Sequence, residues 1–401
     1  MTVGTLPRLT VVGGGIGGFT TALALARRGM DVTVLERAPE FKEIGAGLQL
    51  GPNAGKILQG LGVYDAVLAT AVRPQRFAIV DVYSGKELYQ AALGDELSRR
   101  FGAPYVVLHR HDLLTALMEA AKATGRVEAI PGKEVVDLAQ DADGVTVTCA
   151  DSTSYRSDVL LGADGLRSTV RRHILDDSEP LTSDYVIYRG PGPRTEDIED
   201  AVMLYTGHGM HMMQYPMQGG TIVNRVISFR STRGAPGSDE WATKDELFER
   251  FDGVCDHVRR ALDALDLEKK WVQFDRMPQA GWAQGRVALL GDAAHAMRQY
   301  LAQGAGQSME DAVAVADALS STPDDVPHAL ASYEALRYPR ASTVQMNTRF
   351  FGEFTHLGGV EAVVRNYLLK SMRSDDYEFV EWLYGDRGVA APVPPKTLAL
   401  Y

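Results

Sequence analysis

The sequence has few cysteines and no long uninterrupted hydrophobic run, and each absence excludes a class of protein. Its 401 residues include two cysteines, Cys149 and Cys255, too few for a disulfide framework and without a paired-cysteine metal or redox motif. Residues 9–26 are apolar, but a cluster of glycines interrupts them, which a membrane span or signal segment does not need. We therefore expect a cytoplasmic protein with no metal site, targeting segment or stable membrane insertion.

Positive charge is also scarce. The chain carries 41 Lys and Arg against 52 Asp and Glu, a net charge of -11, and its basic residues form no dense run. This balance argues against nucleic acid or an anionic membrane as a partner, and an anionic substrate would need local positive charge. With 45% apolar and 23% charged residues, the composition is that of a globular protein of two or three packed units.

A glycine-rich segment near the start of the chain is its clearest motif. Leu9–Val12 is a short β-branched run that leads into GGGIGG, after which alanines and leucines recur at helical spacing. In this strand, turn and helix, Gly13 permits the turn, Gly15 lets the backbone approach a pyrophosphate, and Gly18 lets helix and strand pack closely. The start of the helix then faces the phosphates.

A second predicted strand, residues 31–35, ends at an acidic side chain. Glu36 follows the glycines by about 20 residues, the spacing at which a carboxylate accepts hydrogen bonds from a ribose with a free 2′-hydroxyl. Glu36 and the adjacent Arg37 are candidate cofactor contacts. A glycine loop that serves only packing is the alternative, and the complete unit favours dinucleotide binding without distinguishing FAD from NAD.

Later segments place polar residues at the start of helices. In the sequence HRHDLL, Arg110 could lie against a cofactor phosphate or ribose, and Asp112 is a plausible N-cap. A buried strand then runs into Asp164 and Gly165 and a basic helix start. These residues are therefore candidates for the same cofactor site.

The strand-to-turn design is repeated near residue 290. There VALL runs into Gly291 and Asp292, and the chain continues through Gly304 into an amphipathic helix. Asp292 could serve only as a helix cap, but that alternative does not explain the repeated design around it. The order of these motifs carries the resemblance that follows.

The three motifs, in this order, resemble those of the single-component (class A) flavoprotein aromatic hydroxylases. The resemblance implies an α/β fold, with a Rossmann-type FAD-binding domain, an inserted mixed β-sheet substrate domain and a helical C-terminus. It implies that Asp164 and Gly165 serve both FAD and the nicotinamide, and that Gly291 and Asp292 hold the flavin ribityl chain and pyrophosphate. Because no second GxGxxG occurs, we expect NADH or NADPH to bind transiently as co-substrate.

We place the domain boundaries on the same basis. The predicted FAD-binding domain is discontinuous, with residues 1–75, 106–180 and 276–345, and residues 76–105 and 181–275 form the predicted substrate-binding domain. Residues 346–401 form the C-terminal helical segment. The apolar residues of that segment, Phe350, Phe351 and Phe354 among them, could form a homodimer face, although packing within the chain explains them equally well.

The substrate site is predicted from one strand and one loop. By the period-two rule, His211, Met213 and Tyr215 share one face of a strand and are candidates to line a pocket. Gln299 stands where most relatives have a proline. Together with His211 it resembles the 3-hydroxybenzoate 6-hydroxylase branch, which uses NADH and produces gentisate; further predicted substrate contacts are Leu48, Gln49 and Tyr300.

That resemblance implies a mechanism in which a flavin C4a-hydroperoxide, formed with O₂, attacks the ring of a small phenolic acid. Loosening the phenolic proton raises the electron density of the ring, so His211 is the expected base or hydrogen-bond partner. Gln299 would orient the hydroxyl and Tyr215 the ring or carboxylate. The alternatives are a structural histidine at this position, a salicylate or hydroxynicotinate hydroxylase, and a dinucleotide-binding module without turnover.

Overall fold

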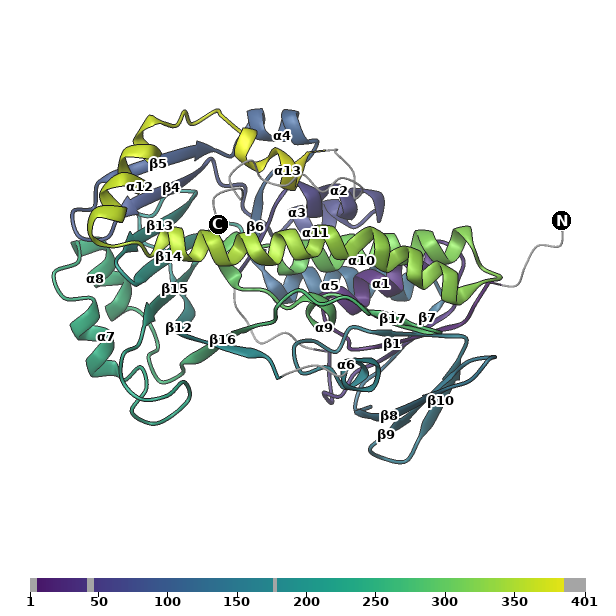
Figure 1. Ribbon diagram of the computed structural model, residues 1–401. Helices are drawn as coiled ribbons and strands as arrows, with labels where there is room; N and C mark the ends of the chain where they lie inside the picture. The colour runs from purple at the N-terminus through teal and green to yellow at the C-terminus, as the bar shows by residue number, and fades with distance from the viewer. Residues whose placement is uncertain (1–5, 42–46, 176–178, 386–401) are drawn as a thin grey trace.

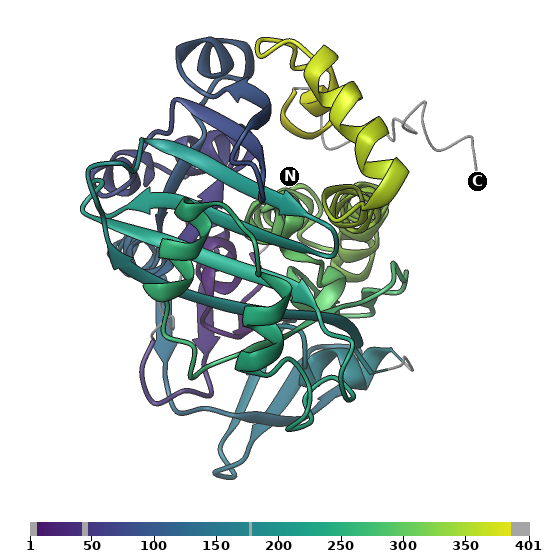
Figure 2. The ribbon, with the colours of Figure 1, turned by 90° about the vertical axis from the view of Figure 1, so that its left-hand side faces the viewer.

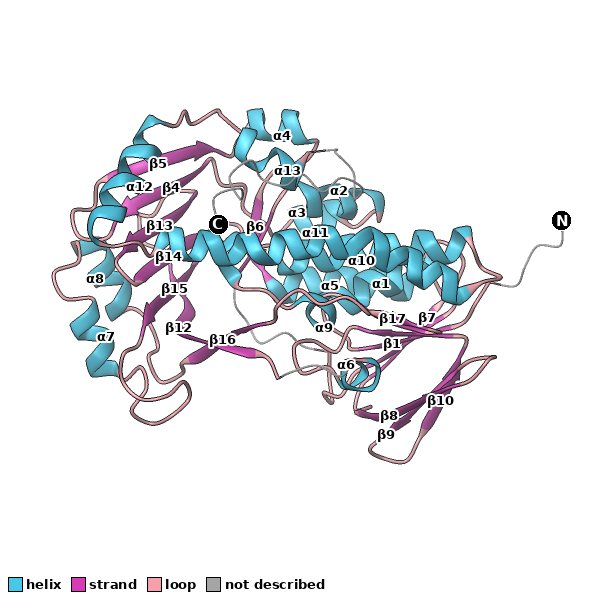
Figure 3. Cartoon of the chain, in the orientation of Figure 1, coloured by secondary structure: helices cyan, strands magenta, loops and turns pink. Residues whose placement is uncertain are grey.

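Two large β-sheets, joined by long helices, make up the fold of the computed structural model, which describes residues 6–41, 47–175 and 179–385 (Figure 1). The six-stranded sheet lies at one end of the molecule and the seven-stranded sheet at the other, with helices α10 (Gly304–Ser321) and α11 (Val326–Thr355) running between them (Figure 3). None of the described helices combines the length and apolarity needed to cross a lipid bilayer.

The six-stranded sheet is parallel except at one edge. Its order is β17-β18-β11-β1-β2-β7, and its strands are β1 (Leu9–Val12), β2 (Val32–Leu35), β7 (Val127–Ile130), β11 (Val159–Gly162), β18 (Val287–Leu289) and the antiparallel β17 (Ala283–Gln284). Both faces are covered, which is why the central strands β1, β11 and β18 are buried and mainly apolar. Helices α1 (Ile16–Ala26), α5 (Arg110–Ala123) and α10 cover one face.

An antiparallel meander and a short helix cover the other face. The meander consists of β8 (Val135–Gln140), β9 (Val145–Cys149) and β10 (Ser154–Ser157), and the helix is α6 (Thr169–Ile174). Side chains alternate between the two layers, so that Val11 packs under the helices and Val12 under the meander. This is the predicted Rossmann-type arrangement.

The seven-stranded sheet is mixed and draws on two stretches of the chain. Its order is β16-β12-β15-β14-β13-β4-β5, and only β4 and β13 pair in parallel. The strands are β4 (Arg76–Asp81), β5 (Glu87–Ala92), β12 (Leu181–Pro193), β13 (Ala201–Gly207), β14 (Met210–Met217), β15 (Ile222–Arg230) and β16 (Trp271–Asp275). The fold class is thus as predicted, and on this topology we propose the division into domains given above.

Helices α7 (Lys244–Arg250) and α8 (Asp256–Asp263) cover the outer face of that sheet, where Figure 2 shows them in front of the strands. The stretch 244–267 thus forms two helices and not one continuous helix. Gly253 adopts a φ of +72° between the two helices, a left-handed conformation that ends a helix and that glycine tolerates at low cost.

The remaining elements connect the two sheets. They are β3 (Gly47–Leu50) and β6 (Val106–His109), which pair with each other, α2 (Pro52–Gly60), α3 (Tyr64–Leu68), α4 (Asp95–Phe101), α9 (Asp292–His295), the 3₁₀ helices η1 (Gln299–Leu301) and η2 (Glu378–Val380), α12 (Gly359–Ser371) and α13 (Glu381–Tyr384).

The predicted N-cap of α5 is wrong. Because β6 extends to His109, the helix begins at Arg110, the His109 ring accepts from the His111 N–H, and Asp112 lies in the first turn.

A buried ion network joins α10, α11 and the turn after β18. The fully buried Arg337 of α11 contacts Glu310 and Asp311 of α10, each at 2.6 Å. Asp311 also accepts from the Gly291 N–H at 2.9 Å and lies 2.6 Å from Nε2 of His295. Burial alone would raise the pKa of Asp311, but His295 and Arg337 outweigh it and hold that pKa well below its usual range.

Replacing the central cation tests this network. Arg337→Met leaves two buried carboxylates without their shared partner, so we expect the free energy of unfolding to fall by about 3–5 kcal/mol. As a control, Arg126→Ala removes an exposed ion pair with Asp31 and should change the value by less than about 1 kcal/mol. Urea denaturation of the three proteins measures both values, and equal losses would contradict a central role for Arg337.

Candidate active site

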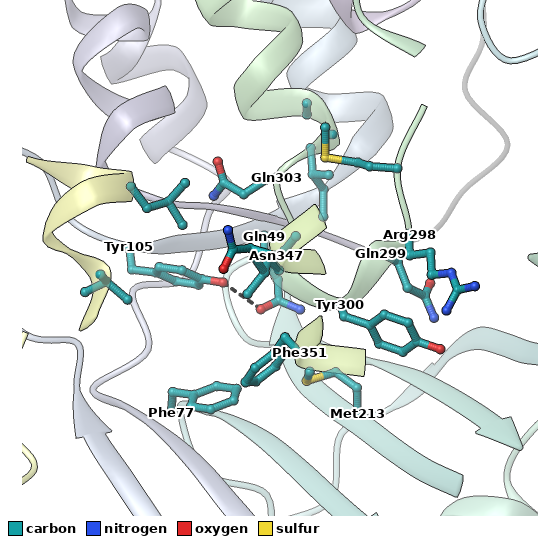
Figure 4. A pocket seen from close by; sticks show the side chains of 18 of the residues that line it. Gln49, Phe77, Tyr105, Met213, Arg298, Gln299, Tyr300, Gln303, Asn347 and Phe351 are labelled. Carbon is teal, nitrogen blue, oxygen red and sulfur yellow. Dashed lines mark hydrogen bonds between the residues drawn. The ribbon is translucent and has the colours of Figure 1, made fainter. Parts of the chain in front are cut away.

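A cavity of about 1340 Å³ lies between the two sheets and is lined by residues of both (Figure 4). Small-molecule sites occupy roughly 300–1,000 Å³, so this one has room for more than one ligand. The turns of the six-stranded sheet line one part, and the inner face of the seven-stranded sheet, with α11 and the segment after α12, lines another.

The turns that follow three neighbouring parallel strands meet at the cavity. Gly15 follows β1, Gly165 follows β11 and Gly291 follows β18, and all three line it, as do Asp292 and Gly304. The N-termini of α1 and α10 open there, and neither helix has an acidic residue in its first turn. Free N–H groups and helix dipoles of this kind suit a pyrophosphate anion.

The two predicted aspartates of these turns have different surroundings. Asp164 accepts from the Ser168 hydroxyl at 2.5 Å and the Thr169 N–H at 2.7 Å, so its carboxylate is used at the start of α6, and it does not line the cavity. Asp292 is exposed, lines the cavity and makes no hydrogen bond to any residue that the structure describes. Asp292 is therefore the aspartate that could accept from a bound cofactor.

Two of the predicted glycines shape the turn and do not line the cavity. A Cβ at Gly13, whose φ is +107°, would lie 2.3 Å from the carbonyl oxygen of Ala163, and a Cβ at Gly18 would lie 1.9 Å from that of Gly13. A substitution at Gly13 would push the turn after β1 away from the end of β11, and one at Gly18 would push α1 away from that turn. These glycines thus allow the close packing on which the position of Gly15 depends.

The acidic residue after β2 also holds the turn. Glu36 accepts from the Gly14 N–H at 2.7 Å and the Ala38 N–H at 2.8 Å. Neither Glu36 nor the exposed Arg37 lines the cavity, whereas Arg110, at the start of α5, does. Of these three predicted contacts, the structure brings only Arg110 to the cavity wall.

The inner face of β14 supplies the predicted pocket residues. His211, Met213 and Tyr215 all line the cavity, while Met210 and Met212 are buried in the core under α7 and α8. Alternation along a strand is the reason, because successive side chains point to opposite faces.

The other predicted substrate contacts also line the cavity. Gln299 and Tyr300 lie in η1, and Leu48 and Gln49 lie in β3. Figure 4 shows Gln49 beside Tyr105, whose hydroxyl donates to the Gln49 side-chain oxygen at 2.8 Å. These contacts give the cavity a second polar wall.

Sequence reasoning missed two polar residues of this wall. Tyr105 precedes β6, and nothing in its local sequence marks it. Asn224 pairs in register with Tyr215, lines the cavity and accepts from the Gly47 N–H at 3.1 Å. The alternation of β15, applied as for β14, would have found Asn224.

A second histidine supports His211. Nδ1 of His211 lies 2.8 Å from Nε2 of His356, the residue that ends α11, and both side chains are buried. Burial lowers the pKa of His211 to about 4, and burial together with His211 lowers that of His356 well below its ordinary value. Both rings are therefore neutral near pH 7, so each keeps a nitrogen lone pair that can accept a hydrogen bond.

Comparison with known proteins agrees with this geometry. A family model described as an FAD binding domain matches residues 8–348. The 3-hydroxybenzoate 6-hydroxylase of Klebsiella oxytoca is 39% identical over 387 residues, which cover 94% of this chain and 96% of that protein. The chain belongs to the class A flavoprotein aromatic hydroxylases. This hydroxylase is thus an FAD-dependent aromatic monooxygenase that uses NADH or NADPH as a transient co-substrate.

Two solved structures share the fold of the hydroxylase. Klebsiella pneumoniae HpxO, complexed with FAD and uric acid, is 28% identical with a TM-score of 0.82, and the match covers 92% of this chain and 94% of that one. A salicylate hydroxylase substrate complex is 27% identical with a TM-score of 0.78, covering 94% and 95%. Both matches extend over both sheets of the hydroxylase.

The residues of the hydroxylase fit FAD on three observations. Two helix N-termini without acidic neighbours open on the cavity, Gly15 and Gly165 bring backbone to its wall, and the Asp292 carboxylate faces it without a partner among the described residues. We expect Gly15 and Gly304 to approach the pyrophosphate and Asp292 to accept from a ribityl hydroxyl. Arg110 lies where it could reach a phosphate or ribose.

Removing the Asp292 carboxylate tests this assignment. A hydrogen bond to a charged group contributes about 1.5–3 kcal/mol, so Asp292→Ala should weaken FAD binding by roughly 10-fold to 100-fold. Fluorescence titration of the apoprotein with FAD measures the affinity. Asp263 is an exposed residue of α8, so Asp263→Ala is the control and should leave the FAD affinity unchanged. Unchanged affinity in Asp292→Ala would exclude this contact.

The histidine pair predicts a pH dependence of stability. In the unfolded chain both rings titrate near pH 6.5, but in the folded state they stay neutral to lower pH. Between pH 6.5 and about 4 the unfolded chain binds more protons, so the free energy of unfolding falls as the pH falls, by up to about 1.4 kcal/mol per pH unit for each histidine.

Urea denaturation at several pH values checks this. The double variant His211→Leu, His356→Leu should lose stability less steeply than the wild type between pH 6.5 and 4.5, because the two buried rings no longer oppose protonation. At pH 7.5 and above, the difference in the free energy of unfolding between the two proteins should be constant. If the free energies of unfolding of the two proteins fell in parallel through the acid range, the rings would protonate as easily in the folded state as in the unfolded chain.

Proposed function

We propose that this hydroxylase converts 3-hydroxybenzoate to gentisate with NADH and O₂. The observation that carries the proposal is the placement of His211 and Gln299, which reach one cavity from two different walls, β14 and η1. A relative that is 39% identical over nearly the whole chain is named 3-hydroxybenzoate 6-hydroxylase, which supports the same substrate. The new hydroxyl group then lies para to the existing one.

The phenolic end of the substrate is held by His211 and Gln299. When bound, FAD, once reduced by the nicotinamide, activates O₂ to supply an electrophilic oxygen atom. Neutral His211 accepts the phenolic proton at Nε2, which raises the electron density of the ring at the position para to the oxygen. The Gln299 amide holds that oxygen in orientation.

The carboxylate end is placed beside Tyr215. Burial dominates and raises the pKa of Tyr215, while Arg189 and Arg110 act on it electrostatically in the opposite direction. Both arginines line the cavity. Since Arg110 is assigned to the cofactor, Arg189 provides the local positive charge that an anionic substrate needs in a chain of net charge -11.

Apolar side chains keep the reacting atoms away from water. Phe77, Met213 and Phe351 lie together on the cavity wall in Figure 4. Excluding water strengthens each polar interaction in the site and protects the activated oxygen from loss as H₂O₂.

A substrate screen tests the proposal. Purified protein with bound FAD should oxidise NADH slowly alone and faster with 3-hydroxybenzoate, and mass and ring-position analysis should identify gentisate. Salicylate and 6-hydroxynicotinate are included because they represent the alternative substrate classes. Stimulation by one of them, with no product from 3-hydroxybenzoate, would reject the proposed substrate, and no stimulation by any of the three would assign the hydroxylase to another class of aromatic substrate.

Variants of the two phenol contacts test their roles. His211→Ala and Gln299→Ala should keep FAD but lower hydroxylation by roughly 100-fold, because the proton acceptor or the orienting amide is lost, while peroxide release per NADH increases. The exposed His328→Ala and Gln75→Ala serve as matched controls and should behave as wild type. Unchanged coupling in both site variants would reject these roles.

A further inference from the structure

We propose that His356 is a positioning residue that fixes the tautomer of His211, so that Nε2 of His211 offers its lone pair to the phenolic hydroxyl. The inference rests on the proposed role of His211 as proton acceptor. It concerns a residue 145 positions away in the sequence, at the end of the helix that also carries Arg337.

The hydrogen bond between the rings couples their tautomers. Nδ1 of His211 and Nε2 of His356 are 2.8 Å apart, the ring centroids are 5.0 Å apart, and the side chains are 3% and 4% exposed. Between two neutral imidazoles one nitrogen must donate and the other accept. The tautomer of His211 is therefore determined by which role His356 takes.

The other nitrogen of His211 remains for the substrate. Nε2 of His211 has no hydrogen-bond partner in the part of the chain that the structure describes, and it is not among the fully enclosed polar atoms without a partner. Since His211 lines the cavity and its Nδ1 is used by His356, Nε2 is the nitrogen that a phenolic hydroxyl can reach.

The position of the His356 ring is itself fixed from several sides. It stacks on Tyr185, with centroids 4.4 Å apart and planes at 17°, and meets the Tyr300 ring edge-on at 5.4 Å. The His356 carbonyl accepts from the Gly209 N–H, in the turn between β13 and β14, at 2.9 Å. The ring is thus tied to the strand that carries His211 and to the segment that carries Gln299.

The surroundings of His356 keep its ring neutral. Burial, His211, Arg365 and Arg298 all lower the pKa of His356, so a proton delivered to this ring would be disfavoured. Proton acceptance by His211 requires that Nε2 of His356 accept from Nδ1 of His211. This places the His356 proton on Nδ1, a buried atom without a hydrogen-bond partner among the described residues, and leaves Nε2 of His211 unprotonated. After the phenolic proton arrives there, the same bond becomes charge-assisted and stabilises the His211 imidazolium.

Two substitutions separate this role from simple packing. His356→Gln replaces Nε2 by an amide oxygen that can accept from Nδ1 of His211 but cannot titrate, whereas His356→Leu fills similar space without an acceptor. His257→Leu is the matched control. His257 is also hydrogen-bonded, to Gln214, but it is not among the cavity-lining residues.

Nitrogen-15 NMR of the histidine rings in the FAD-loaded protein measures the tautomer without turnover, and the chain has nine histidines to assign. We expect His211 protonated at Nδ1 in the wild type, His356→Gln and His257→Leu, and a mixture or the opposite tautomer in His356→Leu. With 3-hydroxybenzoate, kcat should fall roughly 10-fold to 100-fold in His356→Leu, with KM within about twofold and near recovery in His356→Gln.

A wild-type His211 that is protonated at Nε2 overturns the proposal, whether or not any variant folds. So does a His356→Leu protein that keeps both the tautomer and kcat, or a His356→Gln protein that loses as much kcat as His356→Leu. If the wild type forms no gentisate, the proposed function fails, but the NMR measurement still decides the role of His356.

Discussion

The buried carboxylate of Asp311 constrains the cofactor end of the molecule. It accepts the Gly291 N–H, contacts His295 and pairs with Arg337, so one side chain joins the turn after β18 to α10 and α11. A carboxylate that is shielded from solvent needs such partners, because an uncompensated buried charge is strongly destabilising. A shift of the turn would remove the Gly291 hydrogen bond and the His295 contact of Asp311, and these contacts keep Gly291 and Asp292 at the cavity wall.

Helix α11 extends that constraint to the substrate end. Its 30 residues span about 45 Å as an α-helix, from the cofactor sheet to the seven-stranded sheet (Figure 1). Arg337 anchors it in the ion network, and its last residues reach β13 and β14, where the Thr206 hydroxyl donates to the Thr355 carbonyl. The geometry of the His211 site therefore depends on packing in the other half of the molecule.

The two ends of the cavity use different chemistry. At the cofactor end, backbone N–H groups are exposed where glycines and helix N-termini allow close approach, and the side chains of Asp292 and Arg110 accompany them. At the substrate end they are side chains of sheet residues whose neighbours are apolar and aromatic. Backbone groups suit a large anion of invariant structure, and side chains that alternate with apolar residues suit a small ring whose substituents must be distinguished.

Local sequence determined the elements and the face on which β14 presents its side chains. The unit β1-α1-β2, the pocket face of His211, Met213 and Tyr215, and the fold class follow from glycine sterics and from periods of two and 3.6, which depend on near neighbours. Tertiary structure alone decided which polar groups meet. It brought Asp292 to the cavity wall and His356 to His211, because the partner of a buried polar group is chosen by packing between distant segments.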